Sequence, residues 1–353
     1  MTEGSASIVA DTAARIFADL ADPQAVNRAK DGAWKIPLWN ALTEAGLPLA
    51  WVPDELGGSG ADVAEGFAVL GVAGRYALAV PLAETLLAGW LLARANIVAP
   101  ATAMTIAPVR LHERITLNGD GRLAGHAAAV PFAAETHHIA VLADSARGPI
   151  VALVARRDCH VTARRGITDN GSATVDFGGV TPLAHSPAGI DHDTLMLMGS
   201  VVRAVETAGA LEAILTMSVA YANERVAFER PIGKFQAVQQ NLARLAGEVA
   251  AALAVSGSAA DAMAEADDMD DGVFLEAASA KIRCAEAAQE GAAIAHQVFG
   301  AIGFTQEHVL HRFTLRMLAW RDDFGNESHW AAELGRRVAA RGADDFWPLV
   351  ASR

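Results

Sequence analysis

The sequence predicts a mainly α-helical protein with a β-rich middle domain. Alanine-rich stretches are common and aromatic residues make up only 6% of the chain, which favours helices over a β-sandwich or barrel. Between about residues 106 and 190 the helical pattern gives way to short β-prone runs. With 353 residues, 52% of them hydrophobic, the chain is long enough for two or three packed regions.

We expect three domains. An N-terminal helical domain covers residues 1–105, where Leu82, Leu86 and Trp90 belong to a set of apolar residues at helical spacing. A small middle β domain covers residues 106–190. We expect six to eight antiparallel strands there, because runs such as HHIAVLAD and GPIVALVARRD are separated by Gly, Asp and Asn. The remainder, residues 191–353, is expected to form a C-terminal four-helix bundle.

The bundle is predicted from several long helical patterns. We expect helices over about residues 193–228, 235–263 and 273–299, with a further helical segment over residues 307–341. The acidic stretch EADDMDDG, residues 265–272, is expected to be a solvated turn. Helices of this length usually pack as a bundle.

The charge and cysteine content exclude several classes of protein. A net charge of -13 argues against nucleic-acid binding, because phosphate binding needs a basic surface. Cys159 and Cys284 have no metal-ligand spacing near them, so we expect no metal site and a reducing compartment. The start of the chain lacks the pattern of a signal peptide, and the most apolar segment, residues 86–100, is too short to span a bilayer. We therefore expect a cytoplasmic protein without membrane contact.

Three stretches of the sequence carry a resemblance to a known family. They are GLPLAWVPDELGGSG, YANERVAFERPIGKFQAVQQNLARLAGEVAAA and AKIRCAEAAQEGAAIAHQVFGAIGFTQEHVLHR. In this order around a β region, they resemble the acyl-CoA dehydrogenase family of flavoenzymes over essentially the full length of the chain. The resemblance implies the acyl-CoA dehydrogenase fold, FAD as the cofactor, an acyl-CoA thioester as the substrate and an electron-transfer flavoprotein as the electron acceptor.

The resemblance also implies a cofactor site at a subunit interface. In the family, an Arg and a Gln reach across from the neighbouring subunit to the pyrophosphate of FAD, and Arg225 and Gln297 match these residues. Gly300 and Gly303 would let the backbone approach a ligand closely. Four further residues match positions near the adenosine and diphosphate end of FAD: Phe228, Ile232, Phe235 and Gln236.

Taken by themselves, these residues also fit roles that need no cofactor. Arg225 could form a surface salt bridge with Glu224 or Glu229. Gln297 and the glycines after it could mark a plain helix end, where Gly is common in any protein. Phe228 and Phe235 could be core residues.

The chain departs from the family at the catalytic base. The family removes the α-proton of the thioester with a Glu, placed either in a Tyr-Glu-Gly triplet after the last bundle helix or after the Arg of the R-x-x-F segment. Phe324 and Val226 occupy these two positions, and neither side chain can accept a proton. Asp322, Asp323 and Glu327 lie nearby; Asp323 and Glu327 are the candidates for a displaced base, and a solvated turn would also account for them.

The segments that wrap the flavin ring in the family are missing as well. Only Met104 and Thr105 remain of a Q-x-x-TEP-x-x-GSD-like stretch, and no Trp-Ile-Thr-Asn segment follows, so the middle domain is shortened. This pattern is similar to one chain of the heterotetrameric α2β2 acyl-CoA dehydrogenases, known from bacterial steroid side-chain degradation. That chain lacks the base and completes the FAD site from across the interface.

We therefore predict a subunit of an FAD-dependent acyl-CoA dehydrogenase that works with a homologous partner chain. Three alternatives remain open. The first is a self-sufficient homo-oligomeric dehydrogenase that uses Asp323 or Glu327 as a displaced base. The second is a flavin-free paralogue that keeps the bundle only for assembly. The third is a flavin monooxygenase of the same fold, which would use FMNH2 and oxygen and would need no α-proton base.

Overall fold

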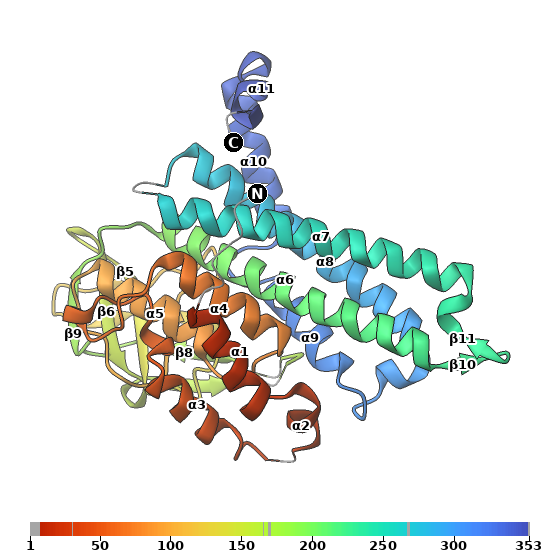
Figure 1. The fold of residues 1–353 in the computed structure, drawn as a ribbon. Helices are drawn as coiled ribbons and strands as arrows, with labels where there is room; N and C mark the ends of the chain where they lie inside the picture. Colours follow the sequence, from red (N-terminus) through yellow and green to blue (C-terminus); the bar gives the residue numbers. More distant parts are fainter. Residues whose placement is uncertain (1–7, 30, 165, 169–170, 267–268, 352–353) are drawn as a thin grey trace. The chain divides into compact units, whose positions relative to one another are not determined.

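The computed structural model describes residues 8–29, 31–164, 166–168, 171–266 and 269–351 (Figure 1). The chain forms two compact units. The first unit consists of Met1–Leu20, Asp31–Val69 and Ala79–Gly199, and the second of Ala21–Lys30, Leu70–Leu78 and Ser200–Arg353. The predicted division into domains at residues 105 and 190 stays a prediction. The predicted order of helices, then strands, then helices is confirmed.

The first unit contains three complete α-helices of the described chain, and one of them is strongly buried. They are α1 (Ile8–Leu20), α3 (Lys35–Glu44) and α5 (Leu82–Arg94), and α4 (Val63–Arg75) begins in this unit. The predicted helical spacing is confirmed in α5, where every residue from Leu82 to Leu92 is buried. The Thr85 hydroxyl accepts a hydrogen bond from the Met104 amide at 3.0 Å, so α5 is tied to the first strand.

Nine strands lie between residues 104 and 187 of the described chain. Six form one sheet: β1 (Met104–Ala107), β2 (Thr116–Leu117), β3 (Leu123–Ala124), β5 (His138–Ser145), β6 (Gly148–Ala155) and β9 (Ala184–Pro187). The other three pair in the order β4 (His126–Val130), β8 (Ala173–Asp176) and β7 (His160–Ala163). The expectation of six to eight antiparallel strands is wrong in two respects. Two-residue strands add to the number, and β1 and β2 both run parallel to β5.

The second unit contains the long helices of the predicted bundle. They are α6 (His192–Glu224), which begins in the first unit, α7 (Gln236–Glu265), α8 (Asp271–Phe299) and α9 (Leu310–Trp320), followed by α10 (Glu327–Arg341) and α11 (Ala343–Ala351). The short α2 (Pro23–Arg28) also belongs to this unit. In it, α7 and α8 lie side by side along their length (Figure 1).

The predicted end of the first long helix, at residue 228, is wrong. The chain leaves the helix after Glu224 and forms a small antiparallel hairpin of β10 (Val226–Ala227) and β11 (Arg230–Pro231). Phe228 and Glu229 at its tip have φ values of 52° and 66°, a backbone conformation that a helix cannot contain. The segment predicted over residues 307–341 is also interrupted, by the turn between α9 and α10.

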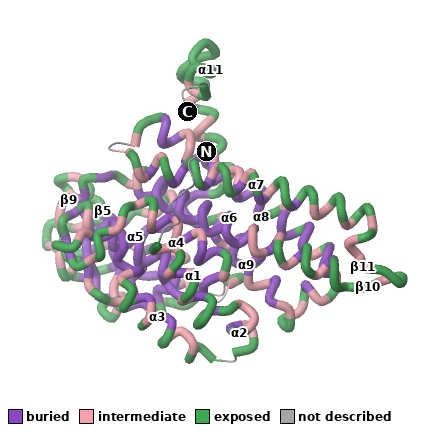
Figure 2. Tube along the Cα trace, viewed as in Figure 1, coloured by how far each residue is buried: buried purple, intermediate pink, exposed green. Residues whose placement is uncertain are grey.

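Helix α8 is central to the second unit. Asp270 caps its start, because its side chain accepts hydrogen bonds from the amides of Gly272 and Val273, both at 2.8 Å. Buried residues run along the helix (Figure 2). Arg337 of α10 pairs with Asp271 at 3.2 Å, which ties α10 to the first turn of α8. The predicted turn at residues 265–272 lies partly outside the described residues.

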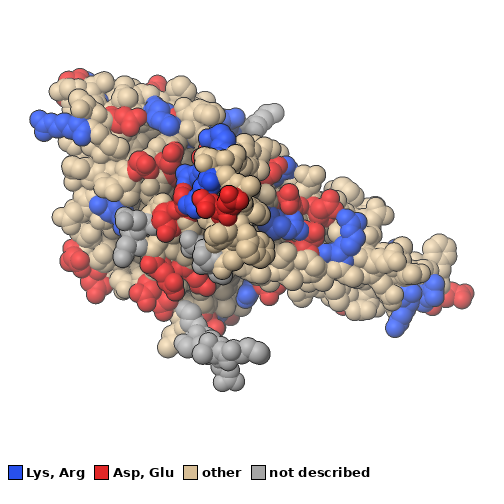
Figure 3. Space-filling model, turned by 90° about the horizontal axis from the view of Figure 1, so that it is seen from above, with Lys and Arg blue, Asp and Glu red and all other residues tan. Residues whose placement is uncertain are grey.

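The exposed charges concern the prediction that the protein does not bind nucleic acid, and the apolar helices concern the prediction that it does not contact a membrane. Acidic side chains are interspersed among the basic ones on the face shown in Figure 3, so the described part of that face has no continuous basic surface. Helices α6 and α7 are long and apolar enough to cross a membrane by length and composition alone. The most apolar window of α6 is 94% buried, as in the core helix of a globular protein, whereas that of α7 is 28% buried.

Glycines allow a close helix crossing in the second unit. A Cβ atom added at Gly209 of α6 would overlap the carbonyl oxygen of Gly71, and one at Gly74 would overlap that of Glu206. Helix α4, which contains Gly71 and Gly74, and helix α6 therefore meet backbone to backbone at this crossing. No side chain fits between them.

We expect Gly209→Ala to destabilise the protein by about 1–3 kcal/mol, because the added methyl group must push two backbones apart. Gly247→Ala in α7 is the matched control, since a Cβ there meets no atom within 4 Å. It should raise stability by about 0.5–1 kcal/mol through helix propensity. Urea unfolding of both variants measures the difference, and equal stability would contradict the close crossing.

Candidate functional site

The turn between α9 and α10 contains Phe324, one of the two positions predicted for a missing base. Phe324 has a φ of 54° and its side chain is 0% exposed. The indole Nε1 of Trp330 donates a hydrogen bond to the Phe324 carbonyl oxygen at 3.0 Å. Gly325 follows with a φ of 88°. The turn is thus folded inward, with the phenyl ring in the core of the second unit.

A buried lysine from α8 holds the backbone of this turn. The Lys281 ammonium donates hydrogen bonds to the carbonyl oxygens of Trp320, at 2.7 Å, and Asp323, at 2.8 Å. Carbonyls at a helix end have no partner within the helix, and the lysine adds a charged donor to two of them. The Trp320 carbonyl oxygen also accepts a hydrogen bond from the Asp323 amide at 3.2 Å. Burial lowers the pKa of Lys281 to about 7, although the neighbouring Asp323 opposes this shift.

An arginine from α6 holds the same turn through a side chain. The guanidinium Nε of Arg203 donates to Asp323 Oδ2 at 3.2 Å, and its Nη1 donates to Glu206 Oε2 at 2.6 Å. The Arg203 Cζ atom lies 5.9 Å from the ring centroids of both Trp320 and Phe324. Asp323 is only 5% exposed. We call Arg203, Glu206, Lys281 and Asp323 the buried ion cluster.

Glu327, the other candidate for a displaced base, is also held in an ion pair. Arg321 Nε donates to Glu327 Oε2 at 2.9 Å, and Arg321 Nη2 pairs with Glu327 Oε1. These hydrogen bonds lower the pKa of Glu327 below its usual range. A lower pKa makes a carboxylate a weaker base, which works against a role in proton abstraction at neutral pH.

Val226, the second predicted position for a missing base, lies far from this turn. It is exposed in β10, beyond the end of α6. Glu224 at that end is 21 residues from Arg203 along one helix, a rise of about 32 Å. Within one chain, a side chain at position 226 is therefore too far from one beside Phe324 for both to act on the same substrate atom, and which of the two positions marks the base stays a prediction.

Most residues predicted to contact FAD lie at that far end of α6. Arg225, Phe228, Ile232 and Phe235 belong to the connection between α6 and α7, and Gln236 is the first residue of α7. Phe228 is 89% exposed, and its ring centroid lies 6.2 Å from that of Phe235. Phe228 is therefore not a core residue. Among the described residues, no ion pair joins Arg225 to Glu224 or Glu229, so the surface salt bridge is absent there.

The C-terminal end of α8 lies next to the C-terminal end of α6. The ring centroids of Tyr221 in α6 and Phe299 in α8 lie 4.5 Å apart, which brings Gln297 to the end of the unit that carries Arg225 (Figure 1). A Cβ atom at Gly300 would meet nothing within 4 Å, so its backbone is open to a ligand. Gly303 differs, because a Cβ there would lie 2.9 Å from that of Phe299. Packing within the unit already accounts for Gly303.

The residues that remain of the flavin-ring segment are core residues. Met104 and Thr105 in β1 are buried, and the Thr105 hydroxyl donates to the Pro131 carbonyl oxygen at 2.7 Å. Both are therefore committed to packing within the first unit.

The chain resembles known proteins over almost its whole length. The family model of the acyl-CoA dehydrogenase C-terminal domain matches residues 193–329. Acyl-CoA dehydrogenase IpdE2 of Mycobacterium tuberculosis is 29% identical over 96% of each chain. Acyl-CoA dehydrogenase FadE27 of the same organism is 28% identical over 86% of this chain and 88% of its own. A chain of the solved ChsE4-ChsE5 complex from Mycobacterium tuberculosis is 27% identical, with a TM-score of 0.85 over 97% of this chain and 99% of its own.

The chain is similar to acyl-CoA dehydrogenases over almost its whole length, and residues 193–329 match the C-terminal domain of that family. The resemblance and the fold predicted from the three sequence stretches are thereby confirmed. The family consists of oxidoreductases that act on the CH–CH bond of acyl-CoA thioesters. In this chain, Phe324 stands at the predicted position of the base, and Asp323 and Glu327 on either side of it are held by arginines.

The predicted set of site residues did not include the buried ion cluster, apart from Asp323. A signal for Arg203 and Glu206 is present in the sequence, because the run LMGSVVRAVETAG places two charges three residues apart in an otherwise apolar helix. Lys281 likewise interrupts an alanine-rich run. Charges in such positions are rarely buried without partners, but the sequence does not show which partner each one has.

Lys281 should make stability depend on pH. Its folded-state pKa of about 7 lies below the value of 10.5 for an unfolded lysine, so between these pH values the unfolded protein binds more protons. Wild-type stability should therefore rise with pH in this window, relative to Lys281→Met, by at most about 1.4 kcal/mol per pH unit. Urea unfolding from pH 6.5 to 10 measures the slope, with Lys234→Met as a control for loss of an exposed lysine. Parallel curves for wild type and Lys281→Met would contradict the buried position.

Proposed function

We propose that this chain is the subunit of an FAD-dependent acyl-CoA dehydrogenase that lacks the catalytic carboxylate and completes the FAD site of a homologous partner chain. The complex would remove the α-proton and the β-hydride of an acyl-CoA thioester, and FAD would accept the hydride. The partner would supply the base and most contacts to the flavin ring. This chain would supply contacts to the phosphate and adenosine end from across the interface.

The observation that carries the proposal is the closed turn around Phe324. A base must bring a free carboxylate within hydrogen-bond reach of the substrate Cα. Phe324 has no such group, and Asp323 is buried against Arg203. Releasing Asp323 would leave the guanidinium of Arg203 with one carboxylate fewer inside the core, which costs about 3–5 kcal/mol for a buried ion pair. Glu327 would have to leave Arg321, which keeps its pKa low.

The exposed end of α6 supports the cofactor part of the proposal. Arg225 presents an exposed guanidinium with no ion pair to a described residue, and its planar fork suits the paired oxygens of a pyrophosphate. Phe228 offers an exposed aromatic ring beside it. Gln297 and the open backbone at Gly300 come to the same end on α8. Donors and a flat apolar surface of this kind fit the diphosphate and adenosine of FAD.

The comparison with solved structures supports a partner chain. The chain matches one component of a structure described as a ChsE4-ChsE5 complex, in which two differently named proteins assemble. A homologous acyl-CoA dehydrogenase chain is thus the partner we propose, and an electron-transfer flavoprotein is the electron acceptor that we expect. Cys159 and Cys284 are free thiols, in keeping with a cytoplasmic complex.

A self-sufficient homo-oligomeric enzyme is the main competing function. It would require Asp323 or Glu327 to leave its arginine and reach the substrate. The ion pairs of both carboxylates argue against this function.

In the complex of this chain and its partner, we expect Arg225→Ala to lower the affinity for FAD by about 10- to 100-fold, because one or two charge-assisted hydrogen bonds are lost. Arg225→Lys should bind FAD with intermediate affinity, because it keeps the charge and loses the fork. Arg244→Ala is the matched control, since Arg244 is exposed and pairs with Glu290 on the bundle. Fluorescence of released FAD measures retention, and size-exclusion chromatography checks that the complex assembles. An Arg225→Ala complex with unchanged FAD affinity would contradict the assignment.

A further inference from the structure

The second unit contains a cavity of about 530 Å³ outside the turn and the predicted cofactor residues. One face of α6 forms its long wall, from Glu212 through Thr216, Met217 and Tyr221 to Glu224. Apart from the adjacent Thr216 and Met217, these positions are three or four residues apart, so they share one side of the helix. Because α6 is continuous from Glu212 to Glu224, the 12 steps between them give a wall about 18 Å long. The volume of the cavity is in the range of ligand sites in proteins.

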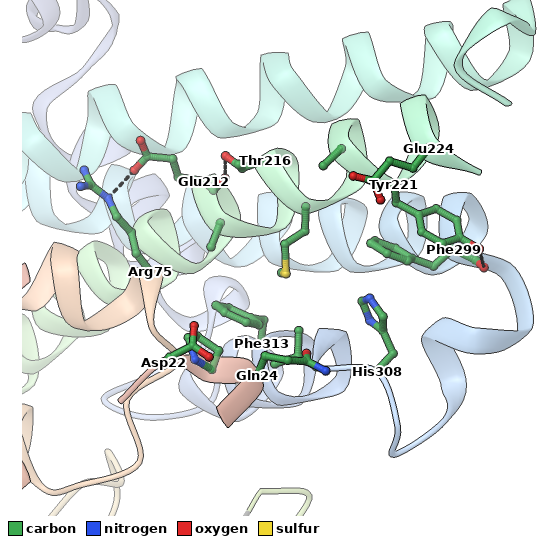
Figure 4. A pocket seen from close by; sticks show the side chains of 15 residues that line it. Asp22, Gln24, Arg75, Glu212, Thr216, Tyr221, Glu224, Phe299, His308 and Phe313 are labelled. Atoms are coloured by element: carbon green, nitrogen blue, oxygen red, sulfur yellow. Dashed lines mark hydrogen bonds and ion pairs between the residues drawn. The ribbon is translucent and has the colours of Figure 1, made fainter. Parts of the chain in front are cut away.

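The opposite wall comes from two other elements of the same unit. Asp22 and Gln24 contribute from the start of α2, and His308 and Phe313 from the start of α9 and the residues before it. Figure 4 shows Arg75 and Glu212 at one end of the cavity and Tyr221, Glu224 and His308 at the other. The cavity is therefore an elongated groove with polar groups at its ends.

Aromatic rings line the end at Glu224. The Phe299 ring lies between two others, with its centroid 4.5 Å from that of Tyr221 and 4.4 Å from that of His308. His308 Nδ1 accepts a hydrogen bond from the Leu310 amide at 3.1 Å, so the proton of the neutral ring is on Nε2. Burial lowers the pKa of His308, which favours this neutral form. His308 thus adds a ring and no positive charge.

The charges of the lining are mostly negative. Arg75 is the one guanidinium among the described lining residues, and it pairs with Glu212 at 2.6 Å. Asp22 uses one oxygen to cap α2, where it accepts a hydrogen bond from the Ala25 amide at 2.8 Å. The Glu224 carboxylate makes no hydrogen bond or ion pair with any described residue. Negative charge is therefore uncompensated at the aromatic end.

We propose that this cavity binds a small organic cation with an elongated apolar body. The cationic group would lie at the aromatic end, beside Glu224 and the ring of Tyr221. Aromatic faces and a carboxylate together are the surroundings in which proteins hold ammonium groups. The apolar body would extend along α6 beside Met217 and Phe313. The same charges disfavour an anion, so this site is distinct from any site for acyl-CoA, whose phosphates need basic partners.

Three probes of equal length and different charge test the proposal: 4-phenylbutylamine, 4-phenylbutan-1-ol and 4-phenylbutyrate. Isothermal titration calorimetry on the full chain should show that the amine binds more tightly than the alcohol. The carboxylate should bind at least about tenfold more weakly than the amine, because it meets like charge in a partly desolvated site. Equal affinities for the three probes, or no binding of the amine, would overturn the proposal.

Two variants place the site. Glu224→Gln should weaken binding of the amine by about two- to fivefold, as for an exposed ion pair, and should leave binding of the alcohol unchanged. Ala220→Phe adds a ring to the α6 wall and should weaken both probes. Glu55→Gln removes an exposed carboxylate from the first unit and is the matched control for charge. Amine affinity that is the same in Glu224→Gln and Glu55→Gln would overturn the assignment of Glu224. Circular dichroism checks that each variant is folded.

Discussion

The ion pair between Arg203 and Asp323 fixes the part of the molecule on which the functional account depends. It joins α6 to the turn after α9, and Lys281 of α8 holds the backbone of the same turn through two carbonyl oxygens. Side chains from two helices that are distant in sequence, α6 and α8, therefore hold the turn at residues 321–326. Breaking a buried ion pair by removing one partner costs several kcal/mol, so the turn is a fixed part of the core and not a loop free to rearrange. Phe324 points inward as a consequence.

The buried turn held by Arg203 and the exposed hairpin after Glu224 lie at different places along α6. Near Arg203, α6 contributes to a closed core in which Asp323 is buried and held in an ion pair. About 32 Å further along, the same helix ends in an exposed hairpin that presents Arg225 and Phe228. An exposed end of this kind, together with a phenyl group at position 324, suits the proposed role in which chemistry happens on another chain. The cation-binding cavity proposed here runs along α6 from Glu212 to Glu224, so its aromatic end borders the exposed hairpin.

Much of the fold could be predicted from the sequence, because its long helices have strong apolar periodicity. Helix α5 and the approximate bounds of α7 and α8 follow from that pattern. The hairpin after Glu224 could not be predicted, since strands of two residues carry no periodic signal and the positive φ values fall on Phe228 and Glu229 instead of Gly. Position 324 followed from motif alignment. The Arg203–Asp323 pair could not be predicted, because it joins residues 120 positions apart and no local sequence pattern indicates such a contact.

The central claim is that this chain has no catalytic base of its own. The most direct test is anaerobic mixing of this chain with FAD and a panel of acyl-CoA thioesters, followed by measurement of the flavin absorbance. We expect no bleaching by this chain alone, and bleaching once the base-bearing partner chain is added. In that complex, Asp323→Asn and Glu327→Gln should preserve reduction wherever the complex assembles. Bleaching by this chain alone, abolished by either substitution, would contradict the account and identify that carboxylate as the base.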